Sequence, residues 1–318
     1  MGRVHPGDQA FDSDSLLGTE TEMPFSGARS FMRRRLSRDL TGVDYAIMGV
    51  PYDLSTSGRP GARLGPEALR RATSQLSWGE VWPWGFDPFD RLAVVDYGDV
   101  FYQRGQPQEM LENTYRQALH VLKTGCRLIS LGGDHLTTYP LLKAHAEIHG
   151  PLALIQFDAH RDTAKSKFLD HGSFVRYAMN EGLIDPSRSI QVGIRTHYEL
   201  DDPIRVLHRP WVRDHGVAAM VAEIGRVTDG MPCYLTFDID CVDPAYAPGT
   251  GTPVVDGLTP GEVFDAIGAL TVPNIVGMDV VEVSPPYDPT ETTALFGASV
   301  ILEHLCAVAS KRPARKAV

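Results

Sequence analysis

The chain has 318 residues, 43% hydrophobic and 22% charged, with a formal net charge of −10. This length fits one large α/β domain or two ordinary ones, and the composition is typical of a globular enzyme. The negative charge argues against a nucleic-acid partner and favours cationic small molecules. We identify no apolar run of about 18 residues, no signal pattern and no CxxC pair, so we expect a cytoplasmic protein without a membrane segment.

Residues 1–40 are polar and mixed in composition. We expect them to form either a mobile tail or an N-terminal arm that packs on a neighbouring subunit. Within them Met32 precedes three arginines, and in so acidic a protein this run favours a solvated or interface-facing position. Residues 41–318 contain no internal repeat or domain-splitting linker and are predicted to form a single domain.

Apolar runs alternate with amphipathic ones along residues 41–318. Buried strands are predicted at 44–50, 92–96, 127–131, 152–157, 189–194, 231–237 and 274–282. Helices are predicted to start at Pro66, to span 107–124 and 259–270, and to end at His149 and near residue 309. This alternation indicates an α/β fold of three αβα layers, in which helices cover both faces of a mostly parallel sheet.

Two local patterns in this region favour structural roles. The glycine-rich stretch 55–66 matches neither nucleotide-binding signature, so we interpret it as a tight loop that leads into a helix. His145 and His149 have an i,i+4 spacing, but the segment lacks the H-E-x-x-H pattern of zinc proteases. We therefore expect these two histidines on a solvated helix face.

Acidic and imidazole side chains follow several predicted strands at their carboxyl ends, where sites form in such sheets. Alternation in an extended backbone would point three of them, within D-A-H-R-D at 158–162, toward one face. Four carboxylates in one crevice would repel each other, and two divalent cations would relieve that repulsion. Oxygen and nitrogen ligands favour Mn²⁺ and leave Zn²⁺, Fe²⁺, Co²⁺ and Ni²⁺ open. The candidate metal ligands are His135, Asp158, His160, Asp162, Asp238 and Asp240.

An alternative interpretation treats these acids as separate turn and cap residues, or D-x-D-x-x-D as a calcium loop. Their joint occurrence with G-G-D-H at 132–135, all at strand ends, favours one shared centre.

The motifs G-G-D-H, D-A-H-R-D, D-I-D-C-V-D-P at 238–244 and V-V-E-V-S-P at 280–285 together resemble those of the ureohydrolases, the family of arginase and agmatinase. The resemblance extends from about Gly49 to Leu305. It implies an arginase-like three-layer fold, a catalytic domain at 41–318, two Mn²⁺ per subunit and a homotrimer or homohexamer. By position it also implies two ligand sets that share Asp158 and Asp238: His135, Asp158, Asp162 and Asp238, and Asp158, His160, Asp238 and Asp240.

The resemblance further implies three catalytic roles. Glu282 would bind the guanidinium group of a small substrate through charge-assisted hydrogen bonds. A metal-bridging hydroxide would attack the guanidinium carbon. Asp162 would relay a proton to the departing amine, His171 would exchange protons with solvent, and urea would leave.

The choice of guanidine depends on the loop after D-A-H-R-D. Relatives that act on amino acids or guanidino acids often place asparagine two residues beyond this motif, where it can reach the substrate carboxylate. This chain has Ala164 there, and L-D-H-G at 169–172 looks closest to bacterial agmatinases. We therefore expect hydrolysis of agmatine to putrescine and urea, a step of polyamine biosynthesis. Lys165 and Lys167 favour the alternative, a guanidinobutyrase or another guanidino-acid ureohydrolase. In the same motif Arg161 would alternate away from the metals.

Two other classes remain open at this point. A non-catalytic relative acting as a binding protein should have lost a metal ligand, Glu282 or His171, and all are present. A metallo-deacetylase with the same kind of fold would not need Glu282.

Overall fold

Eight parallel strands form one sheet in the computed structural model, in the order β2-β1-β3-β8-β7-β4-β5-β6. The structure describes residues 8–11, 15–19, 22–76, 79–199, 201–270 and 274–314. The strands are β1 Tyr45–Gly49, β2 Val94–Asp99, β3 Arg127–Leu131, β4 Ala153–Phe157, β5 Ile190–Ile194, β6 Arg205–His208, β7 Pro232–Asp238 and β8 Asn274–Val281.

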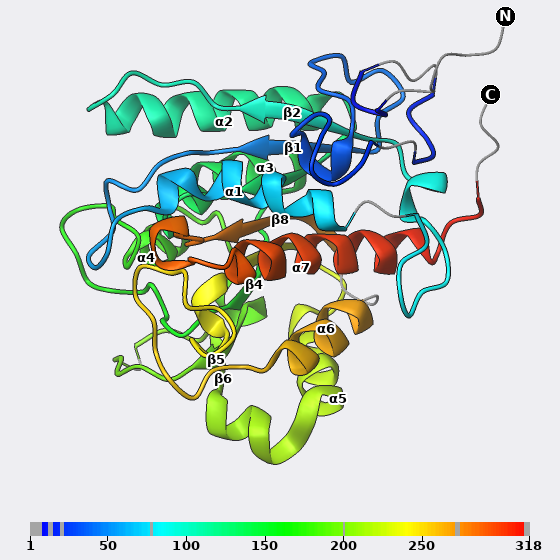
Figure 1. Cartoon of the computed structure of the whole chain (residues 1–318). Coiled ribbons are helices and arrows are strands. Elements are labelled where there is room, and N and C mark those ends of the chain that lie inside the picture. The colour runs from blue at the N-terminus through cyan, green and yellow to red at the C-terminus, as the bar shows by residue number, and fades with distance from the viewer. Residues whose placement is uncertain are drawn as a thin grey trace, which may run out of the picture.

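Helices cover both faces of this sheet (Figure 1). One face packs against α1 (Gly65–Ala72), α5 (Arg209–Thr228), α6 (Pro260–Ala269) and α7 (Thr292–Ala309). The other packs against α2 (Pro107–Lys123), α3 (Thr138–His149) and α4 (Phe174–Asn180). Alternate residues of β1 enter opposite cores: Tyr45 lies in one and Ala46 in the other. The predicted three-layer α/β fold is thus confirmed.

All seven predicted strands are present, with ends that differ by at most three residues. The sequence analysis did not predict β6, α4 or α5. Only one of the four residues of β6 is buried, so its sequence lacks the apolar run that marks a buried strand. In α5 the helical geometry is interrupted at Gly216, where φ is 78°, so the apolar period is broken inside one helix.

The C-terminal helix α7 corrects the expectation that no apolar run is long enough to cross a membrane. Among the described residues α7 is the one helix that is long and apolar enough to do so. However, 72% of the apolar window is buried inside the protein. The composition of α7 is therefore explained by its place in the core, next to α1 (Figure 1).

The arginine run after Met32 is not solvated as expected, because Arg33 and Arg34 are each only 1% exposed. Arg33 Nη1 donates to Asp8 Oδ2 at 2.6 Å. The Arg34 guanidinium lies 4.1 Å from the centroid of the Phe89 ring, and its Nη1 donates to Gly18 O at 2.7 Å. Arg33 and Arg34 are thus buried within the chain itself, and Arg34 packs on Phe89 of the predicted catalytic domain. Residues 1–7, 12–14 and 20–21 lie outside the described ranges, and contact with a neighbouring subunit stays a prediction.

Of the two histidines on α3, only one lies on a solvated helix face as we predicted. His149 is exposed, but His145 is fully buried, with its Nδ1 2.8 Å from Leu141 O. A Cβ added to Gly277 would lie 2.2 Å from His145 Nε2, so this glycine makes room for the ring. His145 is therefore a packed core residue.

Candidate metal centre and active site

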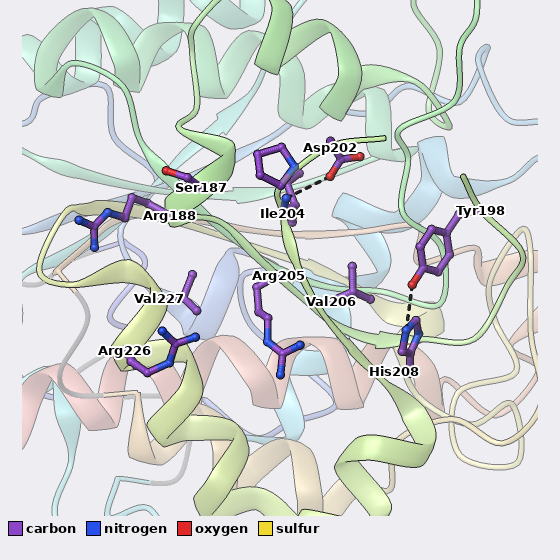
Figure 2. A pocket seen from close by; sticks show the side chains of 11 residues that line it. Ser187, Arg188, Tyr198, Asp202, Ile204, Arg205, Val206, His208, Arg226 and Val227 are labelled. Carbon is purple, nitrogen blue, oxygen red and sulfur yellow. Dashed lines mark hydrogen bonds between the residues drawn. The ribbon is translucent and has the colours of Figure 1, made fainter. Parts of the chain in front are cut away.

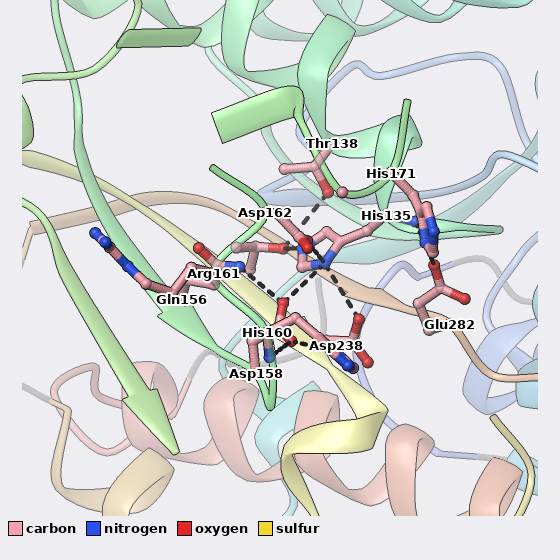
Figure 3. A network of polar contacts seen from close by, with 12 residues as sticks. His135, Thr138, Gln156, Asp158, His160, Arg161, Asp162, His171, Asp238 and Glu282 are labelled. Carbon is pink, nitrogen blue, oxygen red and sulfur yellow. Dashed lines mark hydrogen bonds and ion pairs between the residues drawn. The ribbon is translucent and has the colours of Figure 1, made fainter. Parts of the chain in front are cut away.

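Apart from His171, which lies in the loop before α4, the predicted site residues follow the carboxyl ends of four strands that are neighbours in the sheet, β3, β8, β7 and β4. His135 follows β3, residues 158–162 follow β4, Asp238 ends β7 and Glu282 follows β8. The paired glycines before Asp134 and His135 allow a close backbone approach, because a Cβ on Gly133 would lie 1.8 Å from Tyr52 O. Figure 3 shows the resulting cluster, with Glu282 and His171 at one side.

The segment 158–162 reaches the cluster by a different route from the one predicted. β4 ends at Phe157, the chain bends at Ala159 and His160, and Asp162 has a left-handed φ of 53°. Strand alternation therefore does not bring these side chains together. Glu282 is also left-handed, with φ 64°. Residues other than glycine adopt such a backbone rarely, and strain of this kind is concentrated at functional sites.

The Nδ1 atom of His135 faces three carboxylates. Its Nδ1 lies 2.9 Å from Asp162 Oδ2, 3.1 Å from Asp158 Oδ2 and 3.2 Å from Asp238 Oδ2, yet makes no hydrogen bond. Its Nε2 lies 2.8 Å from Thr236 Oγ1, whose single proton is donated to a buried carboxylate at 2.6 Å. Nε2 is therefore the N–H donor, and the unpartnered Nδ1 faces the acids. A divalent cation at this point would match every ligand atom.

A second ligand group adjoins the first. His160 Nδ1 lies 3.0 Å from Asp240 Oδ2 and 3.5 Å from Asp158 Oδ1. Because Asp158 Oδ2 faces His135, this carboxylate belongs to both groups, as expected for a bridging ligand. Asp238 joins only the first group, and its Oδ1 accepts a hydrogen bond from Asp240 N at 2.8 Å. Bridging by Asp238 stays a prediction.

The electrostatics of the cluster call for added positive charge. Burial and the charge of Asp158 raise the pKa of Asp162 to about 6. Burial and the charges of Asp240 and Asp158 raise the pKa of Asp238 well above its usual value. Burial would lower the pKa of His160, but the charge of Asp240 and hydrogen bonds to both carboxylates raise it to about 12. Divalent cations would stabilise the ionised acids without these protons.

Glu282 is 1% exposed, and its two carboxylate oxygens differ in their hydrogen bonding. Oε1 accepts a hydrogen bond from His135 N at 2.9 Å and lies 3.1 Å from His171 Nδ1. Oε2 is buried and has no hydrogen-bond partner. A Cβ on Gly251 would lie 3.4 Å from Oε2, so the glycine leaves that approach open. A buried carboxylate oxygen without a donor is a binding position for a cation with planar N–H groups.

His171 lies against Glu282 with 12% of its side chain exposed. Burial would lower the pKa of His171. The hydrogen bond to Glu282 and the charges of Glu282, Asp162 and Asp134 offset this effect and raise it to about 9.

A cavity of about 590 Å³ opens over the centre, and its lining includes His160, Asp162, His171, Asp238 and the exposed Ala164. Basic side chains near this cavity are already paired. Lys165 Nζ bonds to Glu199 Oε2 at 2.7 Å and to Asp201 Oδ2 at 2.9 Å. The Arg161 guanidinium bonds to Gln191 and Asp202, while Lys167 is exposed and not among the lining residues. The two lysines that favour a guanidino acid therefore offer no unpaired charge to the cavity: Lys165 is paired with acids, and Lys167 does not line the cavity.

A second cavity, of about 660 Å³, lies beside the edge strand β6 (Figure 2). Its lining includes Arg188, Arg205 and Arg226, which pair with Asp229 and Glu223. No predicted catalytic or metal-binding residue lines this second cavity.

Three buried polar residues that were not predicted from sequence surround the centre. Gln156 Nε2 donates to Asp158 Oδ2 at 2.7 Å, and Thr236 contacts His135. Asp279 accepts hydrogen bonds from the hydroxyl groups of Thr138, Tyr234 and Thr236. A signal was present, because Gln156 and Thr236 each lie two residues before a ligand and so share its strand face.

Comparisons with known proteins are consistent with this geometry. The model of the arginase family matches residues 43–307. An agmatinase of Chromobacterium violaceum is 49% identical over 312 residues, which cover 97% of this chain and 97% of that protein. Among solved structures, a hypothetical agmatinase from Burkholderia thailandensis is 47% identical with a TM-score of 0.94, covering 96% of this chain and 98% of that one. Proclavaminate amidino hydrolase from Streptomyces clavuligerus is 35% identical with a TM-score of 0.84, covering 91% of this chain and 99% of that one.

Proposed function

This chain belongs to the arginase family, and we propose that within it the protein hydrolyses agmatine to putrescine and urea. It is a ureohydrolase, a hydrolase of the amidine C–N bond. The observation that carries the choice of a guanidinium substrate is the buried, unpartnered Oε2 of Glu282, which lies beside His171 at the metal-ligand cluster.

Three features support agmatine within this class. The relatives named agmatinase are 49% and 47% identical to this chain, whereas the one named for proclavaminate is 35% identical. Lys165 is held by two acids, so it offers little free charge to a substrate carboxylate. The net charge of −10 attracts a dication such as agmatine.

The arginase-family fold implies a binuclear divalent-metal site, and we propose that Mn²⁺ occupies it. When bound, the two ions would balance the clustered carboxylates and lower the pKa of a water molecule so that it can act as a nucleophile. The residues that would hold them are His135, Asp158, His160, Asp162, Asp238 and Asp240.

The chain's own residues then position the substrate and move protons. Glu282 Oε2 accepts N–H groups of the guanidinium and fixes the orientation of its carbon. As the new C–O bond forms and the C–N bond to the butyl chain breaks, Asp162 transfers a proton from the attacking water to the departing amine. His171 exchanges protons with solvent, so that the site returns to its starting protonation state.

The remaining proposals concern the setting of the enzyme. We infer a cytoplasmic protein that assembles as a homotrimer or homohexamer and serves polyamine biosynthesis. Gel filtration with light scattering tests the assembly.

Hydrolysis of a guanidino acid is the second candidate function. Arg176 and Lys165 line the cavity, and release of either from its acidic partner would provide a positive charge for a substrate carboxylate.

Urea release with added Mn²⁺ separates these candidates. The substrates are agmatine, 4-guanidinobutanoate, 3-guanidinopropanoate and arginine, and we expect the highest kcat/KM for agmatine. A preference for 4-guanidinobutanoate would favour the second candidate. Absence of urea from every guanidine would overturn the catalytic proposal, and a chelated sample serves as the negative control.

A further inference from the structure

The His171 ring is held on both sides. Its Nδ1 lies 3.1 Å from Glu282 Oε1. Its Nε2 lies 3.0 Å from Ser57 N and 2.8 Å from Ser57 Oγ. A backbone N–H can only donate, so Nε2 must accept, and the proton of the neutral ring lies on Nδ1, where it donates to Glu282. The geometry at Ser57 therefore selects one tautomer of the neighbouring histidine.

The loop that carries Ser57 is anchored before and after this residue. Ser55 N and Oγ donate to Asp134 Oδ2 at 2.9 and 2.7 Å. Asp134 is fully buried and precedes the metal-ligand candidate His135. Beyond Ser57, Arg59 N donates to Gly251 O at 3.1 Å. Because both flanks are fixed, the Ser57 N–H has a defined position relative to the ring.

We propose that Ser57 is a positioning residue for His171, with two separate functions. Its backbone N–H fixes the neutral tautomer that donates to Glu282. Its hydroxyl, which can accept as well as donate, takes the hydrogen bond from Nε2–H when the ring gains a second proton, and passes that proton to water. This inference rests on the proposed function, in which His171 exchanges protons with solvent.

Exposure supports the second function. Ser57 is solvent-exposed, whereas only 12% of the His171 side chain is. The carboxylates whose charges act on His171 are Glu282, Asp162 and Asp134, and Glu282 accepts its hydrogen bond from Nδ1. The Ser57 hydroxyl is therefore the contact of Nε2 that faces water.

The test uses the metal-loaded enzyme and three variants. Ser57→Ala keeps the backbone N–H and removes the hydroxyl, Ser57→Thr keeps both, and Ser187→Ala removes an exposed hydroxyl that bonds to Asp185 in another part of the chain. We expect Ser57→Ala to lower kcat about tenfold with KM for agmatine within twofold, because proton exchange is impaired and binding is not. Ser57→Thr and Ser187→Ala should stay near the parent rate. Added imidazole, a small proton carrier, should restore part of the lost rate in Ser57→Ala.

The tautomer is measured separately from turnover. Ring ¹⁵N shifts of His171, recorded above pH 9, where the ring is neutral, in protein loaded with a diamagnetic divalent ion, should report a protonated Nδ1 in the parent and in Ser57→Ala. A protonated Nε2 in the neutral ring would overturn the first function. An unchanged kcat in Ser57→Ala, or equal losses in Ser57→Ala and Ser57→Thr, would overturn the second. If the parent releases no urea from any guanidine, the proposed function and the proton-exchange function fail together, while the ¹⁵N shifts still decide the tautomer.

Discussion

Replacement of Glu282 by glutamine tests the guanidinium site most directly, because it removes one negative charge and almost no volume. The amide oxygen can take the position of Oε1, which accepts a hydrogen bond from His135 N at 2.9 Å in the parent protein. The amide nitrogen then takes the place of Oε2, which is buried without a partner. Its N–H groups would face the N–H groups of the guanidinium, so an attraction becomes a repulsion.

The expected loss follows from the burial of this carboxylate. A hydrogen bond to a charged group contributes about 1.5–3 kcal/mol. Removal of one partner of a buried charge pair costs about 2–5 kcal/mol. A loss of about 3–5 kcal/mol corresponds to a kcat/KM for agmatine lower by about 10²–10⁴, since each 1.4 kcal/mol is tenfold.

The assay is urea release, combined with inhibition by putrescine, which lacks a guanidinium group. We expect the inhibition constant of putrescine and the bound metal content to change little in Glu282→Gln. The matched control is Glu303→Gln, since Glu303 is a partly buried carboxylate that accepts from Trp84 Nε1 at 3.0 Å, away from the site. A loss in kcat/KM below tenfold, or an equal weakening of putrescine, would refute the assigned role.

Three further predictions concern other features of the site and the core. Gly251→Ala places a methyl carbon 3.4 Å from Glu282 Oε2, so KM for agmatine should rise with metal content unchanged, and an unchanged KM would show that the substrate does not approach this oxygen. Asp279→Asn disturbs the acceptor of three hydroxyl groups and should weaken Mn²⁺ binding about 10–100-fold in a chelator-buffered titration. Tyr234→Phe, which removes one of these bonds, should weaken it less. Burial lowers the pKa of His145 from 6.5 to about 4, so the unfolded chain takes up the proton first, and stability present above pH 6.5 is lost as the pH falls toward 4. His145→Gln should therefore show a smaller drop in melting temperature between pH 6.5 and 5, and equal drops would contradict this account.

Local patterns predicted most of the sheet because its strands are buried on both faces and appear as continuous apolar runs. The edge strand β6 escaped prediction, since only one of its four residues is fully buried. Tertiary contacts also overrode local composition at Arg33. The charge of Arg33 led us to expect exposure to solvent. Inside the protein, however, this charge is paired with Asp8, which lies 25 positions away in the chain. A pairing over that separation leaves no local pattern.

The metal-ligand candidates could be found from sequence because they stand in short motifs at strand ends. The way in which they converge could not, because the bend at Ala159 and the left-handed backbone at Asp162 depend on surrounding contacts. Ser57 illustrates the same limit. Its contact with His171 joins residues 114 positions apart, and half of it is made by the backbone, which carries no side-chain signature.

The left-handed backbone at Asp162 and Glu282 has a consequence for directed evolution. Each residue in that conformation costs about 1–2 kcal/mol that glycine would not. A library selected only for survival at high temperature should therefore enrich glycine at both positions. The resulting proteins would tolerate heat better and would lack the two carboxylates assigned to proton transfer and guanidinium binding. Screens for robust variants of this enzyme need a catalytic readout in every round.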